Sequence, residues 1–138
     1  MRFKGKISKW FYGIMIFAAV ILIPLVILAI KDEKMLVMVV VLGVFALIET
    51  FCFSIIFHNF VELNEDSLLI AFGFVKVHIL YSDIEKISET KDSSSALAAS
   101  FDRVKIQTKN GKIVMISLYN KQEFYKEMQK KNADIRII

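Results

Sequence analysis

The sequence predicts a membrane α-helical hairpin followed by a small, mostly β domain, an antiparallel sandwich or half-barrel capped by a C-terminal helix. Three observations predict this fold. The chain is 56% hydrophobic yet 23% charged. Its charges are segregated, because none lies in residues 10–30 and only Glu49 lies in residues 35–57. Beyond these runs the apolar residues follow a period of two, until a helical period returns at 120–131.

The two apolar runs are expected to cross a membrane. The first, residues 10–30, can span a hydrocarbon core of roughly 30 Å at about 1.5 Å per residue. A cleaved signal peptide is the alternative, but its apolar core is shorter and ends in a small-residue cleavage site. Residues 31–34 are too few for anything but a turn, so the second run, 35–57, returns through the bilayer.

Four basic residues in the first nine set the expected orientation: Arg2, Lys4, Lys6 and Lys9. By the positive-inside rule, residues 1–9 form a basic cytoplasmic N-terminus. Two crossings within 10–58 then return the β domain, residues 59–138, to the same side. The net charge of +4 matches this short segment, so it does not indicate nucleic-acid binding.

Glu49 is the one charged residue within the second run. A carboxylate near the bilayer centre costs on the order of 2.5 to 3.5 kcal/mol on insertion scales, so a protonated or paired state is expected. One interpretation makes it an ion, proton or partner site. The other makes it a neutral carboxyl that is hydrogen-bonded to Tyr12, at a similar depth, or to a second copy of the chain.

The sequence offers no set of residues for catalysis, a cofactor or a metal. Cys52 is the single cysteine, so an internal disulfide is excluded. His58 and His78 are far apart and lack the companion ligands of a zinc site. Phosphate-binding, nucleophile and metalloprotease motifs are missing as well. We therefore expect no enzyme.

Six strands are expected in the β domain. Gly73-Phe74 predicts a tight two-residue hairpin, and Asn110-Gly111 predicts a two-residue type I′ turn. Ile84 and Ile87 are three residues apart, which leaves a helical turn open for that strand, and 90–100 is loop-like with room for a short helical turn. The expected strands are 60–63, 67–72, 75–80, 83–89, a strand around Val104 and Ile106, and 112–117.

A C-terminal helix is expected to close the domain. Asn120 can cap its start, and Asn132 is a plausible stop. Phe124 and Met128, four residues apart, form its packing stripe.

Several of these segments resemble the small bacterial pleckstrin-homology-like (PH-like) domains. They are ILYSDIEKI at 79–87, SFDRVKI at 100–106, the Asn-Gly hairpin, and NKQEFYKEMQKKNADI at 120–135. The resemblance covers about 60–136 and is nearest to members behind one or two membrane helices, some of which are bacteriocin immunity proteins. It implies a bent antiparallel β-sandwich, usually of seven strands, that binds rather than catalyses.

The resemblance also points to candidate partner-binding residues. Ser100, Asp102 and Arg103 match recurring positions of the family. In one interpretation Arg103 contacts a partner carboxylate; in the other, Ser100 and Asp102 cap the loop through backbone N–H groups and Arg103 pairs locally. Lys109 belongs to a basic outer side of the hairpin. The acidic connection at 64–66 argues against phosphoinositide binding.

Together these features predict a non-enzymatic PH-like interaction module, accessory, regulatory or bacteriocin-immunity-like, in a bacterial cytoplasmic membrane. It would be multi-pass with both termini cytoplasmic, and its partners would be the lipid bilayer and an unidentified protein or peptide. The alternative is a small membrane subunit that acts through its helices and Glu49 in assembly or ion coupling. In that case a homo-oligomer through the helices is an option.

Overall fold

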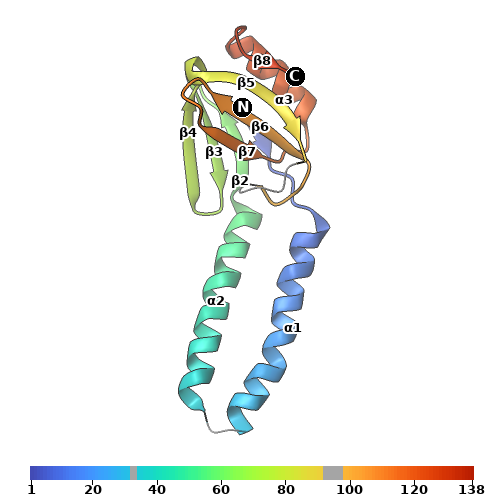
Figure 1. Cartoon of the computed structure of the whole chain (residues 1–138), viewed down its shortest axis with the longest axis vertical. Helices are drawn as coiled ribbons and strands as arrows, with labels where there is room; N and C mark the ends of the chain where they lie inside the picture. Colours follow the sequence, from blue (N-terminus) through green and yellow to red (C-terminus); the bar gives the residue numbers. More distant parts are fainter. Residues whose placement is uncertain (32–33, 92–97) are drawn as a thin grey trace.

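The computed structural model of the 138-residue chain describes residues 1–31, 34–91 and 98–138. Two long helices, α1 (Lys9–Lys31) and α2 (Met35–Phe57), run antiparallel and project from a β domain (Figure 1). Both are long and apolar enough to cross a membrane. Only 6% and 0% of their most apolar windows is buried, so neither is the core helix of a globular domain.

The β domain consists of two four-stranded sheets and a C-terminal helix, α3 (Lys121–Lys131). The first sheet is antiparallel, with the order β1 (Arg2–Lys4), β2 (Asn59–Leu63), β3 (Ser67–Phe72), β4 (Val75–Leu80). A short 3-10 turn at Tyr81–Asp83 leads to the second sheet. Its order is β7 (Ile113–Ile116), β6 (Arg103–Thr108), β5 (Ile84–Thr90), β8 (Arg136–Ile137), with β8 parallel to β5.

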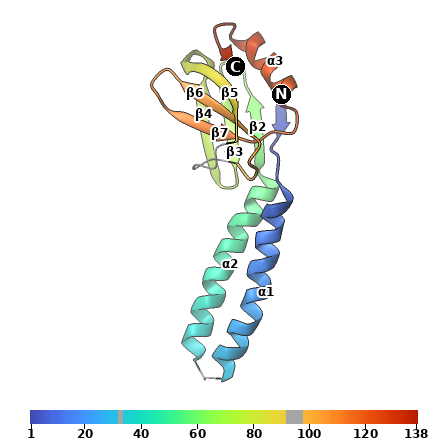
Figure 2. The ribbon, with the colours of Figure 1, turned by 45° about the vertical axis from the view of Figure 1, so that its right-hand side comes forward.

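Strand β1 corrects the expectation that residues 1–9 form only a basic segment. It lies before the helices in the sequence, yet it pairs with β2, which follows them: Phe3 is opposite Val61. The chain then crosses to the other sheet, where the Lys6 N–H donates to the Ser117 carbonyl at 2.9 Å. The helical hairpin is therefore inserted between two neighbouring strands (Figure 2).

The six expected strands are present as β2 to β7, and the structure adds β1 and β8 to them. The interval of three between Ile84 and Ile87 reflects a β-bulge, because the register with β6 shifts between Ile84 and Lys86. The extra residue turns both isoleucines into the core, where each is almost fully buried. The loop expected at 90–100 lies partly outside the described residues.

The core lies between the two sheets and is closed by α3. Phe124 and Met128 are fully buried, which confirms the expected stripe. The ring of Phe3 packs edge-on against that of Phe124, with centroids 5.6 Å apart. Strand β1 thus contributes to the same core as the C-terminal helix.

Of the two predicted hairpin turns, the β3–β4 turn has the predicted length and the β6–β7 turn does not. Gly73-Phe74 is a two-residue hairpin loop, since Phe72 pairs with Val75 and Gly73 has a φ of +61°. The second turn was wrongly expected to be a two-residue type I′ turn. It is a three-residue loop, 109–111. The Thr108 N–H donates to the Lys112 carbonyl, which closes the loop, and the Gly111 N–H donates to the Thr108 carbonyl. This is the pattern of a type I turn followed by a left-handed glycine.

The ends of α3 are also only partly as expected. Asn120 occupies the N-cap position, but its side chain makes no capping hydrogen bond. The prediction that the Asn120 side chain caps the helix was therefore wrong. Asn132 does end the helix, and its side-chain amide donates to the Tyr81 carbonyl at 3.0 Å. This bond ties the helix end to the turn that joins the two sheets.

Replacing Phe3 with alanine tests whether β1 is part of the folded domain. Because Phe3 is 4% exposed, F3A is expected to lower the free energy of unfolding by about 3 to 5 kcal/mol. The measurement is urea unfolding of the full chain in micelles, followed by the β signal in circular dichroism. Tyr119→Ala is the control, since Tyr119 is 58% exposed and should change stability by less than about 0.5 kcal/mol. Equal effects of the two variants would contradict a structural role for β1.

Candidate functional site

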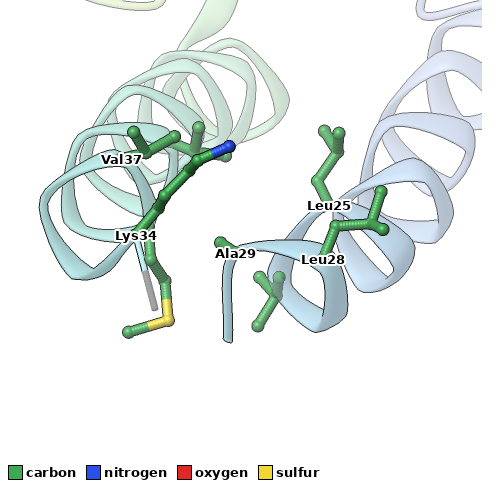
Figure 3. Close-up of a pocket in the computed structure, with 8 residues that line it drawn as sticks. Leu25, Leu28, Ala29, Lys34 and Val37 are labelled. Carbon is green, nitrogen blue, oxygen red and sulfur yellow. The ribbon is translucent and has the colours of Figure 1, made fainter. Parts of the chain in front are cut away.

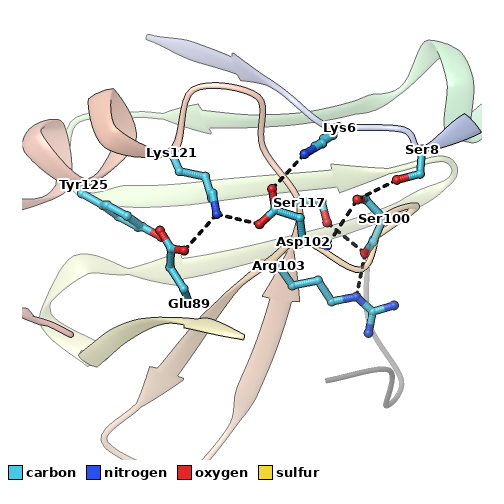
Figure 4. A network of polar contacts seen from close by, with 9 residues as sticks. All are labelled: Lys6, Ser8, Glu89, Ser100, Asp102, Arg103, Ser117, Lys121 and Tyr125. Atoms are coloured by element: carbon cyan, nitrogen blue, oxygen red, sulfur yellow. Dashed lines mark hydrogen bonds and ion pairs between the residues drawn. The ribbon is translucent and has the colours of Figure 1, made fainter. Parts of the chain in front are cut away.

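A chain of polar contacts joins four parts of the molecule: the segment before α1, the end of β5, the residue before β6 and the start of α3 (Figure 4). Asp102 is at its centre. Its two carboxylate oxygens accept from Lys6 Nζ at 2.8 Å and from Lys121 Nζ at 2.6 Å. Lys121 also donates to Glu89 at 3.1 Å, and the Tyr125 hydroxyl donates to Glu89 at 3.3 Å. We call these five residues the polar chain.

The four charged members of the polar chain alternate in sign, so each ion pair stabilises the charged form of both of its partners. Hydrogen bonds from Lys121 and Lys6 lower the pKa of Asp102. Burial lowers the pKa of Lys121, but its hydrogen bonds to Asp102 and Glu89 outweigh burial and raise it overall. Burial and the neighbouring Glu89 raise the pKa of Tyr125. These three groups therefore keep their ordinary charges near pH 7.

Ser100 ties the loop before β6 to its surroundings. Its Oγ accepts from the Ser8 hydroxyl at 2.8 Å and from the Asp102 backbone N–H at 3.3 Å. Its carbonyl accepts from Arg103 Nε at 2.8 Å and from the Ser117 hydroxyl at 3.2 Å. Ser100 is fully buried, so these bonds replace the water that its polar atoms have lost.

Arg103 and its neighbour Phe101 connect the loop to the first helix. The guanidinium carbon of Arg103 lies 5.7 Å from the Phe101 ring centroid. Phe101 in turn stacks on Trp10, the second residue of α1, at 5.3 Å. Arg103 is itself buried, with 5% of its surface exposed. Its contacts with the Ser100 carbonyl and the Phe101 ring are both contacts within the β domain.

The sequence-predicted residues thus divide into groups. The structure brings Ser100, Asp102 and Arg103 together, and Ser100 accepts a backbone N–H as the structural interpretation expects. The carboxylate of Asp102 instead pairs with two lysines. Lys109 is remote from them: it is exposed in the β6–β7 loop, and its backbone N–H donates to the Asp83 carbonyl at 2.8 Å.

The two candidate polar residues of the helices, Tyr12 and Glu49, do not meet. Glu49 Oε1 is buried without a hydrogen-bond partner. Among the described residues no hydrogen bond joins Glu49 to Tyr12, which is 41% exposed on α1, so this one of the two bonds considered for a neutral Glu49 is not formed. The bond to a second copy of the chain stays a prediction. The face of α2 that carries Glu49 also carries Val41 and Phe45, and these residues are half-buried where the residues around them are exposed.

Four members of the polar chain carry no signal in the sequence: Lys6, Glu89, Lys121 and Tyr125. Lys6 and Asp102 are 96 positions apart, and lysine before a membrane helix is explained equally well by the positive-inside rule. In the part of the chain that the structure describes, no cluster of three His, Cys, Asp or Glu residues could hold a metal ion.

A cavity of about 190 Å³ lies between the helices at the end away from the β domain (Figure 3). Its lining is apolar except for Lys34, the residue before α2, whose side chain lies on the α2 side of the cavity. A cavity with such an apolar lining suits hydrocarbon rather than a polar substrate. The lining residues are Leu25, Val26, Leu28, Ala29, Lys34, Val37, Met38 and Val41.

Comparison with known protein families finds a match within the β domain. A family model described as "Bacterial PH domain" matches residues 61–132, which span β2 to α3. No curated protein matches the chain. Among solved structures, the C-terminal domain of an unknown protein from Leishmania infantum is similar, with 11% identity and a TM-score of 0.40. The match covers 52% of this chain and 65%, less than two thirds, of that one.

Replacing Asp102 with asparagine should destabilise the domain in a pH-dependent manner. At neutral pH, D102N is expected to lower the free energy of unfolding by only about 1 kcal/mol, because partly exposed ion pairs are weak. The folded-state pKa of Asp102 lies below its ordinary value of 3.8, so its contribution is complete above that value and is lost as the pH falls through the lowered one. The difference between wild type and D102N should therefore shrink only below about pH 4.

The measurement is the unfolding free energy of both proteins between neutral pH and pH 2.5. Asp134→Asn is the matched control, because the carboxylate of Asp134 makes no ion pair in the described part of the chain. A difference that stayed constant into the acid range would show that the ion pairs of Asp102 are not responsible.

Proposed function

Because the chain belongs to the bacterial PH domain family, we propose that it is a non-enzymatic interaction module anchored in a bacterial cytoplasmic membrane. One observation carries the proposal: the helical hairpin is inserted between β1 and β2, which are adjacent in one sheet. Both domain-proximal helix ends are therefore held at the same domain. Three basic residues before α1 and Lys9 at its first position favour the cytoplasm as the side on which this domain and both termini lie.

The proposed partner of the domain is a protein or peptide. Lys109 supports this role, because it is exposed in the β6–β7 loop, at the end of the domain away from the helices (Figure 1). Lys112, in the same loop region, adds a second exposed positive charge. Such a surface suits an acidic partner segment. Protection against a bacteriocin, or regulation of a neighbouring membrane protein, is the form that this role is proposed to take.

Photo-crosslinking in intact cells tests this surface. A benzophenone amino acid in place of Lys109 in the full chain is expected to capture a protein, and Lys112→Glu should reduce that capture because it reverses the charge. Gln129, exposed on α3, is the control position and should capture less. If capture were equal at both positions, or insensitive to Lys112→Glu, the β6–β7 loop would not be the partner surface.

Glu49 supports a second candidate function, in which the helices assemble with another membrane segment. The observation in its favour is the buried Oε1 without a hydrogen-bond partner. Because the Glu49 side chain as a whole is only half-buried, its carboxyl group can turn toward a donor on a neighbouring helix, and in hydrocarbon it gains from that bond. The partner would be a second copy of the chain or another membrane protein, in an assembly or ion-coupling role.

Two substitutions of Glu49 separate this candidate from the first. Glu49→Leu is expected to weaken self-association roughly fivefold to tenfold, whereas Glu49→Gln keeps a hydrogen-bonding group and should retain most of it. The measurement is the monomer–oligomer ratio in vesicles by single-molecule photobleaching. Unchanged association of Glu49→Leu would remove the support for assembly through this residue and leave the β domain as the working part.

A further inference from the structure

The β3–β4 turn reaches beside helix α2 (Figure 1). At its tip, the Phe74 ring centroid lies 6.4 Å from that of Phe51. Phe51 is not at the end of α2 but precedes the last residue, Phe57, by six positions. That interval corresponds to about 9 Å along a helix axis. The turn therefore lies level with the apolar part of α2 and not above it.

The position of this turn is fixed by packing against α2. The Gly73 N–H donates to the carbonyl of His58, the residue after the helix, at 2.7 Å. A Cβ atom on Gly73 would come within 2.6 Å of Ser54 Oγ and 3.1 Å of Ile55 Cγ1. The glycine thus allows both the φ of +61° and the close approach of the turn to the helix.

The tip itself is apolar and exposed. Phe74 is 68% exposed and Val75 is 41% exposed, so the contact with Phe51 covers only part of the phenylalanine ring. Lys76, the next residue, is exposed on the outer face of β4. An apolar tip followed by a lysine suits a boundary where a ring enters the hydrocarbon and an ammonium remains among the headgroups.

A second aromatic contact lies at the start of α1. Phe101 is 50% exposed and stacks on Trp10, which is 38% exposed. Each helix therefore carries a partly exposed aromatic side chain of the β domain beside it at its domain-proximal end. Tryptophan at that place is typical of the membrane interface.

We propose that the β3–β4 turn is a membrane-inserting contact, in which Phe74 enters the lipid of the leaflet that faces the domain. Phe101 provides the corresponding contact beside α1. The partner is bilayer lipid, because Phe74 lies level with a residue inside α2 and the adjacent charge is positive. The inference rests on the proposed membrane anchoring, and it adds a defined face by which the domain lies on the bilayer.

Depth-dependent fluorescence quenching of the full chain in phosphatidylcholine–phosphatidylglycerol vesicles tests the proposal. Trp10 is the single tryptophan, so Trp10→Phe gives a silent background that keeps an aromatic ring beside Phe101. In this background, Phe74→Trp should lose fluorescence to brominated phospholipids and resist aqueous acrylamide. Ile113→Trp is the matched control, because Ile113 is 47% exposed beside the β6–β7 loop and should respond to acrylamide alone.

A tryptophan in place of Leu47, which is 73% exposed on α2, reports on the membrane anchoring itself. Quenching of Leu47→Trp by brominated lipid, together with acrylamide quenching of Phe74→Trp, would overturn the insertion of the turn and leave the anchoring intact. No lipid quenching of Leu47→Trp would overturn the anchoring and the insertion together. Protection of Phe74→Trp from both quenchers would show that protein, and not lipid, covers the turn.

Discussion

The pairing of β1 with β2 is the constraint on which the remaining structure depends. The two strands flank the helical hairpin in the sequence and are neighbours in the sheet, so the segments 2–4 and 60–62, one before the hairpin and one after it, lie about one strand spacing apart, roughly 4.8 Å. Whatever the two helices cross, their domain-proximal ends remain on one side of it. The same pairing brings Phe3 into the core and positions Lys6 beside Asp102.

The polar chain acts on geometry more than on stability. Lys6 and Asp102 have side chains that are 34% and 41% exposed, and ion pairs of such exposure contribute at most about 1 kcal/mol. The apolar core, in contrast, includes many fully buried side chains from both sheets and α3. The polar chain instead specifies which segments meet, because Asp102 is held from one side by the segment before α1 and from the other by α3.

Local patterns predicted the parts of the fold that depend on local interactions. The bounds of β3, β4 and α3 agree with the sequence because alternation, a glycine turn and an i, i+4 stripe act over a few residues. Strand β1 was missed because three residues with two charges carry too little periodicity, and its partner is almost 60 positions away. In the candidate site, Ser100, Asp102 and Arg103 were found through resemblance, but the lysines that hold Asp102 come from distant segments.

A PH-like domain joined to a membrane helix by a single strand could rotate about that strand. Here two connections enter one sheet, and Trp10 and Phe51 pack on Phe101 and Phe74 beside the two helix ends. Each added contact removes rotational freedom before any partner binds, so less entropy remains to be lost on binding. The β6–β7 loop is at the opposite end of the domain from the β3–β4 turn. With the domain lying on the bilayer through Phe74, Lys109 would point away from the membrane, toward partners that approach from solution.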